Sequence, residues 1–209
     1  MNRTEHKQEH APSYYAATQT DQETYPALLG DIATGVCVIG GGFTGVATAL
    51  TLAERGYEVA LVEANRIGWG ASGRNGGQLI NGIGGLARIR QKYGDQLADV
   101  LWDMRWRGNS IIRERVHKYA IDCDLKNGYV EVARKPRQVA HIHEEAEERE
   151  RRNFPHPYEV WDATQTEGYL GTDKFHGGFA CFRDGHVHPL NLCKGEARAA
   201  ATLGTKIFE

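Results

Sequence analysis

The feature that most constrains the fold is a glycine-rich turn at residues 40–45, which reads Gly-Gly-Gly-Phe-Thr-Gly. It satisfies the pattern G-x-G-x-x-G. The turn follows a short apolar run at 36–39 and precedes a segment at 43–55 whose apolar residues recur at helical spacing. A second apolar run follows at 58–62. A strand, a turn, a helix and a strand in this order predict a βαβ unit with buried parallel strands.

The residue types in the turn indicate what it binds. Gly40 permits the sharp turn, Gly42 lets the backbone approach a pyrophosphate, and Gly45 lets the helix pack closely on the strand. The helix start, at Phe43 and Thr44, offers backbone N–H groups and a partial positive charge to phosphates. The turn therefore predicts a dinucleotide site.

An acidic residue, Glu63, ends the second strand 18 residues after Gly45. A carboxylate at this place can accept hydrogen bonds from both hydroxyls of an adenosine ribose, and it would repel a 2′-phosphate. NADP is therefore disfavoured, whereas NAD and FAD both remain possible.

A second glycine-rich segment helps to decide between NAD and FAD. Residues 30–85 hold 15 of the 25 glycines, and a long connection at 64–85 carries many of them. Loops of this length inside a compact domain are usually functional or disordered. An extended FAD can lie along 70–78, where Ser72 and Arg74 can bind phosphate or ribityl oxygens and the glycines can adopt unusual backbone angles. Nicotinamide dehydrogenases do not typically need such a segment, so it favours FAD.

Composition and residue spacing argue against several other classes of protein. The formal net charge is -2, without the basic excess of a nucleic-acid-binding protein. No apolar run approaches the roughly 20 residues that span a bilayer, and residues 1–10 lack the apolar core of a secretory signal. The four cysteines form no Cys-x-x-Cys pair, so we expect reduced thiols, a cytoplasmic location and no metal. His141 and His143, two residues apart, cannot share one helix face.

The remaining segments predict a mixture of helices and strands. A helical pattern covers 86–119, a densely charged segment at 136–152 reads as a solvated helix, and Asp162 with Gln165 can cap a brief helix. A further helix is expected from Pro189 to Gly204. The expected strands are 128–133, 158–161, 178–182 and 205–209. The apolar stripe of the first helical segment, expected to face a core, is Leu97, Val100, Leu101, Met104, Ile111 and Ile112.

Several other residues have plain structural interpretations. Residues 1–31 read as a polar arm, in which the adjacent Tyr14 and Tyr15 predict docking onto the rest of the protein. His186 and His188 are expected as turn and helix-cap residues rather than as ligands of a substrate.

These motifs resemble the FAD-dependent amine and amino-acid oxidoreductases of the D-amino-acid-oxidase (DAO) type. The resemblance rests on the turn at 40–45, on Glu-Ala-Asn-Arg at 63–66 and on Gly-Trp-Gly-Ala-Ser-Gly-Arg-Asn-Gly-Gly-Gln at 68–78. It extends from about residue 13 to 209, with supporting segments at 13–17, 121–124, 185–192 and 195–197.

The resemblance implies an α/β fold in which a Rossmann-like FAD-binding βαβ domain of the GR2/DAO type carries an inserted α+β substrate domain, both incomplete in this chain. The implied parts are an arm at 1–31, the FAD-binding unit at 32–85, the substrate region at 86–185 and a return to the FAD domain at 186–209. The strand at 205–209 would join the sheet beside the second strand. Members of the family are roughly twice as long as this chain.

The resemblance also implies a function. It is the FAD-dependent oxidation of a C–N bond in an amine of the gamma-glutamylputrescine kind to an imine, with oxygen as acceptor and peroxide as product. The alternatives are a sarcosine- or D-amino-acid-type oxidase, an NAD-dependent dehydrogenase and an inactive, truncated nucleotide-binding fragment. No catalytic residue is identified. The predicted cofactor-binding residues are Gly40, Gly42, Phe43, Thr44, Gly45, Glu63, Ala64, Arg66, Ala71, Ser72, Gly73, Arg74, Asn75, Gly76, Gly77 and Gln78.

Overall fold

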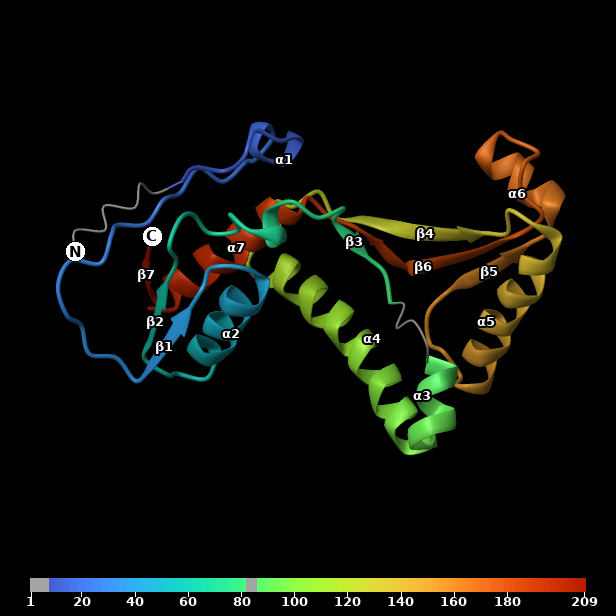
Figure 1. Cartoon of the computed structure of the whole chain (residues 1–209), viewed down its shortest axis with the longest axis horizontal. Coiled ribbons are helices and arrows are strands. Elements are labelled where there is room, and N and C mark those ends of the chain that lie inside the picture. Colours follow the sequence, from blue (N-terminus) through green and yellow to red (C-terminus); the bar gives the residue numbers. More distant parts are fainter. Residues whose placement is uncertain (1–7, 82–85) are drawn as a thin grey trace. The chain divides into compact units, whose positions relative to one another are not determined.

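The computed structural model describes residues 8–81 and 86–209, which form two compact units (Figure 1). Unit 1 combines the N-terminal residues up to Gln78 with Trp106–Leu125 and Val187–Glu209. Unit 2 combines Leu79–Arg105 with Lys126–His186. The parts of the expected arm and glycine-rich loop at 1–7 and 82–85 lie outside the described residues.

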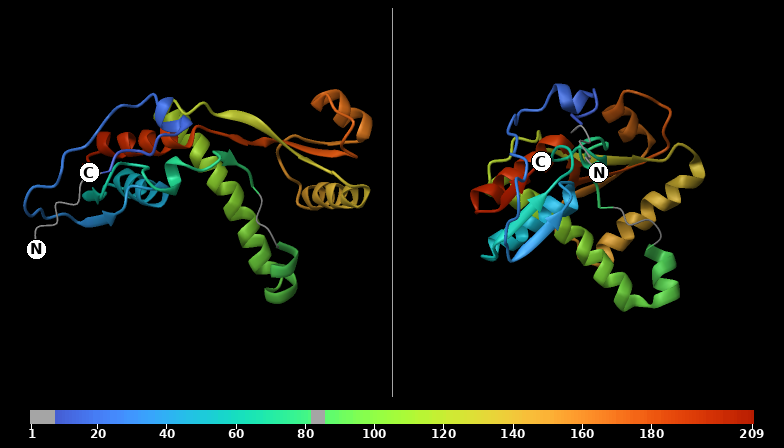
Figure 2. Two further views of the ribbon diagram at one scale, coloured as in Figure 1. Left: turned by 45° about the horizontal axis from the view of Figure 1, so that its top comes forward. Right: turned by 60° about the vertical axis from the view of Figure 1, so that its left-hand side comes forward.

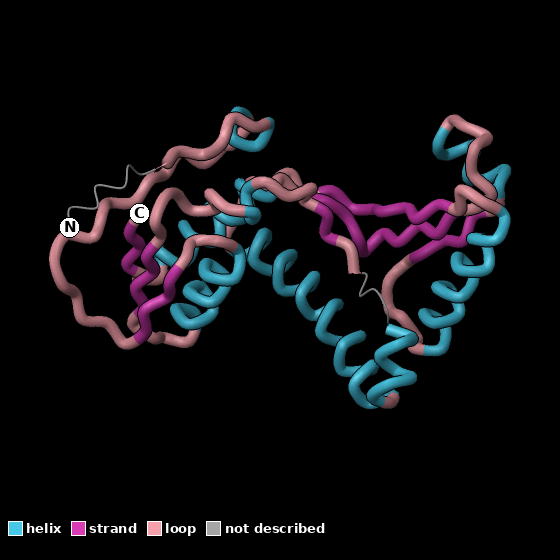
Figure 3. Tube along the Cα trace, in the orientation of Figure 1, coloured by secondary structure: helices cyan, strands magenta, loops and turns pink. Residues whose placement is uncertain are grey.

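Unit 1 contains a three-stranded parallel sheet in the order β1-β2-β7 (Figure 3). Its strands are β1 (Val36–Ile39), β2 (Val59–Val62) and β7 (Lys206–Phe208). Val38 pairs with Leu61, and Leu61 pairs in turn with Ile207. The structure thus confirms the βαβ unit and the expected place of the last strand beside β2.

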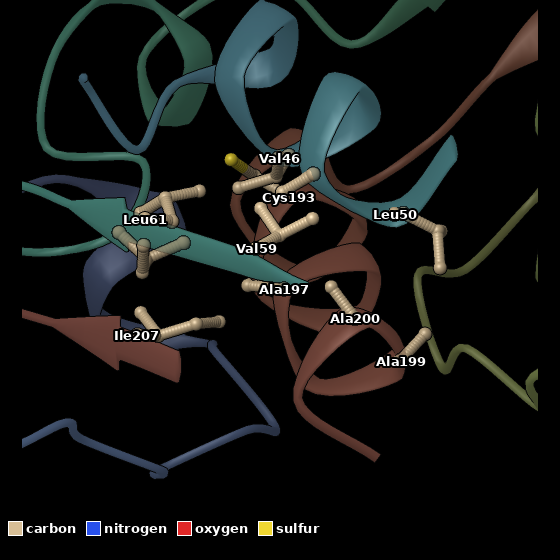
Figure 4. Packing of buried hydrophobic residues seen from close by; sticks show 11 residues of the cluster. Val46, Leu50, Val59, Leu61, Cys193, Ala197, Ala199, Ala200 and Ile207 are labelled. Atoms are coloured by element: carbon tan, nitrogen blue, oxygen red, sulfur yellow. The ribbon is translucent and has the colours of Figure 1, made fainter. Parts of the chain in front are cut away.

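Helices α2 (Phe43–Glu54) and α7 (Pro189–Thr202) pack with this sheet to form the core of unit 1. Figure 4 shows Val46 and Leu50 of α2 beside the small residues of α7, whose short side chains permit close packing. Leu50 and Leu61 are fully buried, and burying each stabilises the fold by about 1.5–3 kcal/mol. The helix α2 ends as expected, since Gly56 adopts a positive φ of 81° just after it.

The predicted helical segment at 86–119 is two helices, α3 (Leu86–Tyr93) and α4 (Asp95–Lys118). Gly94, with φ at 86°, separates them. The predicted apolar stripe is wrong for three residues of α4, because Leu97, Val100 and Met104 are 40%, 49% and 60% exposed. The buried face of α4 instead includes Ala98, Trp102, Asn109 and Arg115.

Unit 2 is built on an antiparallel sheet around β6 (Gly178–His186), which is longer than the predicted strand at 178–182. Strands β4 (Lys126–Val132) and β5 (Tyr158–Trp161) pair with β6 in antiparallel fashion, and β3 (Gln78–Leu79) lies at one edge of the sheet. The register of β4 shifts between Asn127 and Tyr129, where Gly128 has a φ of 99°.

Unit 2 also contains helices that follow β4 in the chain. The short η2 (Pro136–Gln138) leads into α5 (Val139–Arg151), and α6 (Ala163–Leu170) begins with the predicted capping box of Asp162 and Gln165. The interpretation of α5 as a solvated helix is wrong on one face, which buries Ile142, Ala146 and Arg149. The Arg149 guanidinium lies 4.3 Å from the ring centre of Phe179 in β6, so its charge is buried against the sheet.

Among the described helices, none combines the length and the apolar character that crossing a membrane requires.

Candidate functional site

The glycine-rich turn has the backbone geometry that its sequence predicted. Gly40 adopts a φ of 100°, and its N–H donates to the Val62 carbonyl at 2.8 Å, which ties the turn to β2. A Cβ on Gly45 would lie 1.8 Å from the Gly40 carbonyl oxygen and 3.6 Å from Val38 Cγ1. The sharp turn at Gly40 and the close helix packing at Gly45 are therefore confirmed.

Gly42 is the N-cap residue of α2, and no side chain of its own can cap the helix. Ser72, in the short helix η1 (Ala71–Gly73), does so instead, because its Oγ accepts a hydrogen bond from the Phe43 N–H at 2.9 Å. A Cβ on Gly42 would lie 2.9 Å from that Oγ. The two glycine-rich segments therefore meet at the start of α2, and Gly42 makes the room for Ser72.

Glu63 lies beside this turn with its carboxylate held at both oxygens. Its Oε2 accepts from the Gly41 N–H at 2.7 Å, and its Oε1 accepts from the Asn65 N–H at 2.9 Å. Each carboxylate oxygen has a second lone pair for a ligand hydroxyl. The strand end and the loop thus fix Glu63 in one orientation.

Gly41 is a site residue that the sequence pattern missed. A Cβ at this position would lie 2.5 Å from Ile67 Cδ1 and 3.2 Å from Glu63 Cβ. A side chain at 41 would push against Ile67 and Glu63, whereas glycine lets the turn approach Glu63 and donate its N–H. The run of three glycines at 40–42 was the available signal, since the dinucleotide pattern itself needs only two of them.

The second glycine-rich loop is organised by Asn75. Its Nδ2 donates to the carbonyls of Ala71 and Ser72 at 3.2 and 3.0 Å, and its Oδ1 accepts from the Gly77 N–H at 2.8 Å. A Cβ on Gly73 would lie 2.3 Å from the Gly68 carbonyl oxygen. The need for glycine at 73 thus comes from the packing of this chain on itself.

Close packing within the chain also explains the glycine at 77. Its φ is 64°, and a Cβ would lie 2.0 Å from the Val187 carbonyl oxygen. The Val187 N–H donates to the Gly77 carbonyl at 2.8 Å. The loop is therefore fastened directly to the segment that leads into α7.

The other predicted site residues differ in their surroundings. Ala64, Gly76 and Gln78 are exposed. Arg74 is exposed too, and it donates to the Gly70 carbonyl at 3.2 Å. The guanidinium of Arg66 binds the carboxylates of Glu9 and Glu209. The structure therefore brings together the turn at 40–45, Glu63 and Ser72.

His188 is the N-cap of α7, as its sequence context predicted. Its Nδ1 accepts from the Asn191 N–H at 3.1 Å, and its Nε2 lies 3.1 Å from the Thr18 hydroxyl. The Tyr15 ring centre lies 5.0 Å from the imidazole centre. Burial lowers the pKa of His188 below 6.5. The tyrosine segment α1 (Tyr14–Ala17) therefore docks beside the start of α7 (Figure 2), whereas His186 is exposed.

Unit 2 contains a cavity of about 620 Å³ lined by aromatic and charged side chains. Arg105 lies over the Trp102 ring, 3.8 Å from its centre. Burial, reinforced by the charge of Arg149, lowers the pKa of Arg105 to about 10. Sequence reasoning missed this cavity, because its walls come from segments far apart in the chain.

The geometry of unit 1 fits an adenine dinucleotide. The first N–H groups of α2 have no acceptor within the helix. Ser72 Oγ accepts from that of Phe43, and phosphate oxygens can accept from the N–H groups that follow it. The space that a Cβ would take at Gly40 contains no other atom within 4 Å. The fixed Glu63 carboxylate suits the two hydroxyls of a ribose. These observations concern the adenosine and pyrophosphate half of such a cofactor.

Comparison with known proteins identifies the family. The family described as FAD dependent oxidoreductase (DAO) matches residues 35–209. The chain is 42% identical over 202 residues to gamma-glutamylputrescine oxidoreductase of Escherichia coli strain K12, which covers 96% of this chain and 47% of the relative. It is 41% identical over 204 residues to the probable oxidoreductase OrdL of Haemophilus influenzae, again 47% of that protein. The chain thus spans about half the length of these curated relatives.

Solved structures share the fold. Glycine oxidase from Bacillus cereus superimposes with a TM-score of 0.61 at 25% identity, over 85% of this chain and 46% of that one. L-amino acid deaminase from Proteus vulgaris gives a TM-score of 0.71 at 23% identity, over 89% and 42% of the two chains. With the family match over residues 35–209, these findings establish that the chain belongs to the DAO family of FAD-dependent oxidoreductases.

Proposed function

We propose that the protein oxidises a C–N bond in an amine of the gamma-glutamylputrescine kind. The observation that carries this proposal is the 42% identity to gamma-glutamylputrescine oxidoreductase along 96% of the chain. FAD, when bound, supplies a hydride acceptor for the carbon that bears the nitrogen, so that the amine becomes an imine. We further propose that water hydrolyses the imine to an aldehyde and an amine or ammonia, and that oxygen is the final electron acceptor and yields peroxide.

The proposed role of unit 1 is to bind and orient the cofactor. The turn at 40–45 and the start of α2 hold the pyrophosphate, and Glu63 accepts hydrogen bonds from the ribose hydroxyls. The Ser72 hydroxyl already accepts from Phe43, so its proton remains available for a phosphate or ribityl oxygen. Unit 1 would thus serve as the FAD domain, and unit 2 as part of the substrate domain.

We propose a cytoplasmic location for the protein. Cys37, Cys123, Cys181 and Cys193 are all free thiols. Burial raises the pKa of Cys123 to about 11, which keeps this thiol protonated and unreactive. Free thiols are typical of a reducing compartment.

A second candidate within the same family is an oxidase of sarcosine or D-amino acids. The superposition with glycine oxidase at 25% identity favours an amino-acid substrate. Both candidates require FAD, which is the family's cofactor, and the NAD-dependent alternative receives no support from the family match.

The deciding experiment uses the protein expressed from its complete reading frame and purified with FAD. We expect flavin absorbance to accompany the protein, and gamma-glutamylputrescine to bleach that absorbance without oxygen. In air, we expect peroxide to form with turnover. Bleaching by sarcosine or D-amino acids alone would replace the proposed substrate by the second candidate. Protein without flavin absorbance would contradict the cofactor-binding site itself.

A further inference from the structure

The N-terminal arm is fastened along α7 within unit 1. Lys194 of α7 donates from its Nζ to Gln19 Oε1 at 3.0 Å, and Arg198 pairs with Asp21 at 3.1 Å. The Thr20 N–H also donates to Asn191 Oδ1, at 3.1 Å. The arm therefore has a defined course over unit 1, which brings its residues at 8–10 to the loop after β2.

Arg66 is the centre of the contact between the arm and that loop. Its Nε lies 3.1 and 2.9 Å from the two carboxylate oxygens of Glu9, and its Nη2 also binds Glu9. Its Nη1 lies 3.2 Å from Glu209 Oε2. The guanidinium is thus bound by two carboxylates of this chain.

Glu209, which binds Arg66, also connects the loop after β2 to the arm. Its side chain is only 3% exposed. Its Oε1 accepts from the Ile67 N–H at 2.7 Å, and its Oε2 accepts from the Tyr25 N–H at 3.0 Å. One buried carboxylate therefore joins the loop after β2, the arm and Arg66.

The arm also reaches the Glu63 carboxylate through Asn65. The Gln8 N–H donates to Asn65 Oδ1 at 3.0 Å, and the Asn65 N–H donates to Glu63 Oε1 at 2.9 Å. The Trp69 indole N–H adds a bond to the Glu9 carbonyl at 3.0 Å. The arm thus contacts the same residue, Asn65, whose N–H helps to orient Glu63.

We propose that Arg66 is a positioning residue, which together with Glu9 and Glu209 fastens the arm to the loop and thereby holds Glu63 for the ribose of FAD. This replaces the sequence-based expectation that Arg66 contacts the cofactor itself. The proposal rests on the proposed ribose role of Glu63.

The test compares Glu9→Gln with the matched control Glu23→Gln, which removes an exposed carboxylate of the same arm. Glu9 is 69% exposed, so its replacement leaves the core intact. Two quantities are measured on the complete protein: the dissociation constant for FAD, by flavin fluorescence, and the rate of proteolysis within the arm. We expect Glu9→Gln to raise the dissociation constant about fivefold, the loss of one charged hydrogen-bonded pair. We also expect it to speed cleavage of the arm, and the control to change neither quantity.

The outcomes separate this proposal from the site on which it rests. If Arg66→Met weakens FAD binding while Glu9→Gln does not, Arg66 contacts the cofactor directly and the positioning role is wrong. Faster cleavage of the arm with unchanged FAD affinity in Glu9→Gln also overturns the proposal. Weaker FAD binding in Glu63→Ala would in that case still support the ribose site. An unchanged affinity in Glu63→Ala overturns the ribose site and this proposal with it.

Discussion

At the scale of single residues, the glycines of unit 1 are needed for two different structural reasons. Gly40 adopts backbone angles that other residues avoid. Gly45, Gly73 and Gly77 let backbone atoms approach within distances that a Cβ forbids, and Gly77 also has a positive φ of 64°. Gly41 leaves room for the side chains of Ile67 and Glu63. The glycine excess therefore reflects a chain folded tightly on itself around the turn as much as it reflects room for a cofactor.

Gly45→Ala tests the close approach at the turn. Its Cβ would lie 1.8 Å from the Gly40 carbonyl oxygen, so either the turn or the helix must shift. We expect the free energy of unfolding to fall by about 1–3 kcal/mol, as for other overpacked sites, and FAD binding to weaken. Urea denaturation and flavin titration measure the two effects. The control is Gly108→Ala in α4, where a Cβ meets nothing within 4 Å; equal losses in both variants would refute the explanation.

Glu63→Ala tests the ribose role. Removing the carboxylate deletes the acceptor for the ribose hydroxyls and leaves the N–H groups of Gly41 and Asn65 without their present partner. We expect the dissociation constant for FAD to rise about tenfold or more, as for loss of a hydrogen bond to a charged group. Glu58→Ala is the control, since Glu58 is an exposed residue that pairs with Lys206 at 3.1 Å. Isothermal titration of both apoproteins supplies the comparison.

At the scale of elements, a buried ionic cluster connects three helices of unit 1. Arg115 of α4 donates to Glu196 Oε1 of α7 at 3.2 Å. It also donates to Thr51 Oγ1 and Glu54 Oε2 of α2, at 2.7 and 3.1 Å. Burial raises the pKa of Glu196, although the charge of Arg115 opposes that shift. The cluster therefore fixes the part of α4 that belongs to unit 1, from Trp106 onward, against the two core helices. The Arg115 cation also stabilises the buried Glu196 carboxylate.

Arg115→Met is expected to lower the free energy of unfolding by about 3–5 kcal/mol, because it leaves the buried Glu196 carboxylate without its cation. The double variant Arg115→Met with Glu196→Leu should regain most of the loss, since no buried charge then remains. Urea denaturation of the two variants and the parent protein provides the measurement. A double variant as unstable as the single one would show that packing, and not charge, explains the loss.

At the scale of the whole molecule, each unit has its own sheet and its own source of stability. Unit 1 depends on the apolar core between α2, α7 and its parallel sheet. Unit 2 adds an ionic network, in which Glu148 of α5 binds Arg90 of α3 at 2.9 Å and Arg152 at 2.6 Å. Arg152 also binds Asp99 of α4 at 2.6 Å. We therefore expect acid to lower the stability of unit 2 by protonating the carboxylates of this network.

The acid response of Glu148 has a definite sign. Burial disfavours its charge, but hydrogen bonds from Arg90 and Arg152 outweigh burial and lower its pKa from 4.5 to about 2. Because the pKa is lower in the folded state, the stabilisation is complete above pH 4.5 and is lost as the pH falls towards 2. In Glu148→Gln, we expect the unfolding temperature to vary less across this range than in the parent or in Glu147→Gln. Circular dichroism at a series of pH values measures it, and parallel curves for all three proteins would contradict the assignment.

Local signals account for what the sequence predicted well. The strand, turn and helix around 36–55 have periodicities that neighbouring residues set, and the cap at Asp162 lies within one helical turn. The buried face of α4 was not predictable in this way. Three of its apolar residues, Leu97, Val100 and Met104, are exposed, while Asn109 and Arg115 are buried. Distant partners decide that face, because a buried guanidinium is acceptable only where carboxylates meet it.

The sequence by itself determined the βαβ unit, the dinucleotide turn, the acidic residue after the second strand and the resemblance that named FAD. These follow from short-range spacing, since a turn and the helix it starts lie within a few residues of each other. Only the tertiary structure decided that Ser72 caps α2, that Gly41 holds Glu63, and that Arg66 faces Glu9 and Glu209. Those contacts join residues up to 143 positions apart. Their geometry depends on how the whole unit packs, which no local pattern contains.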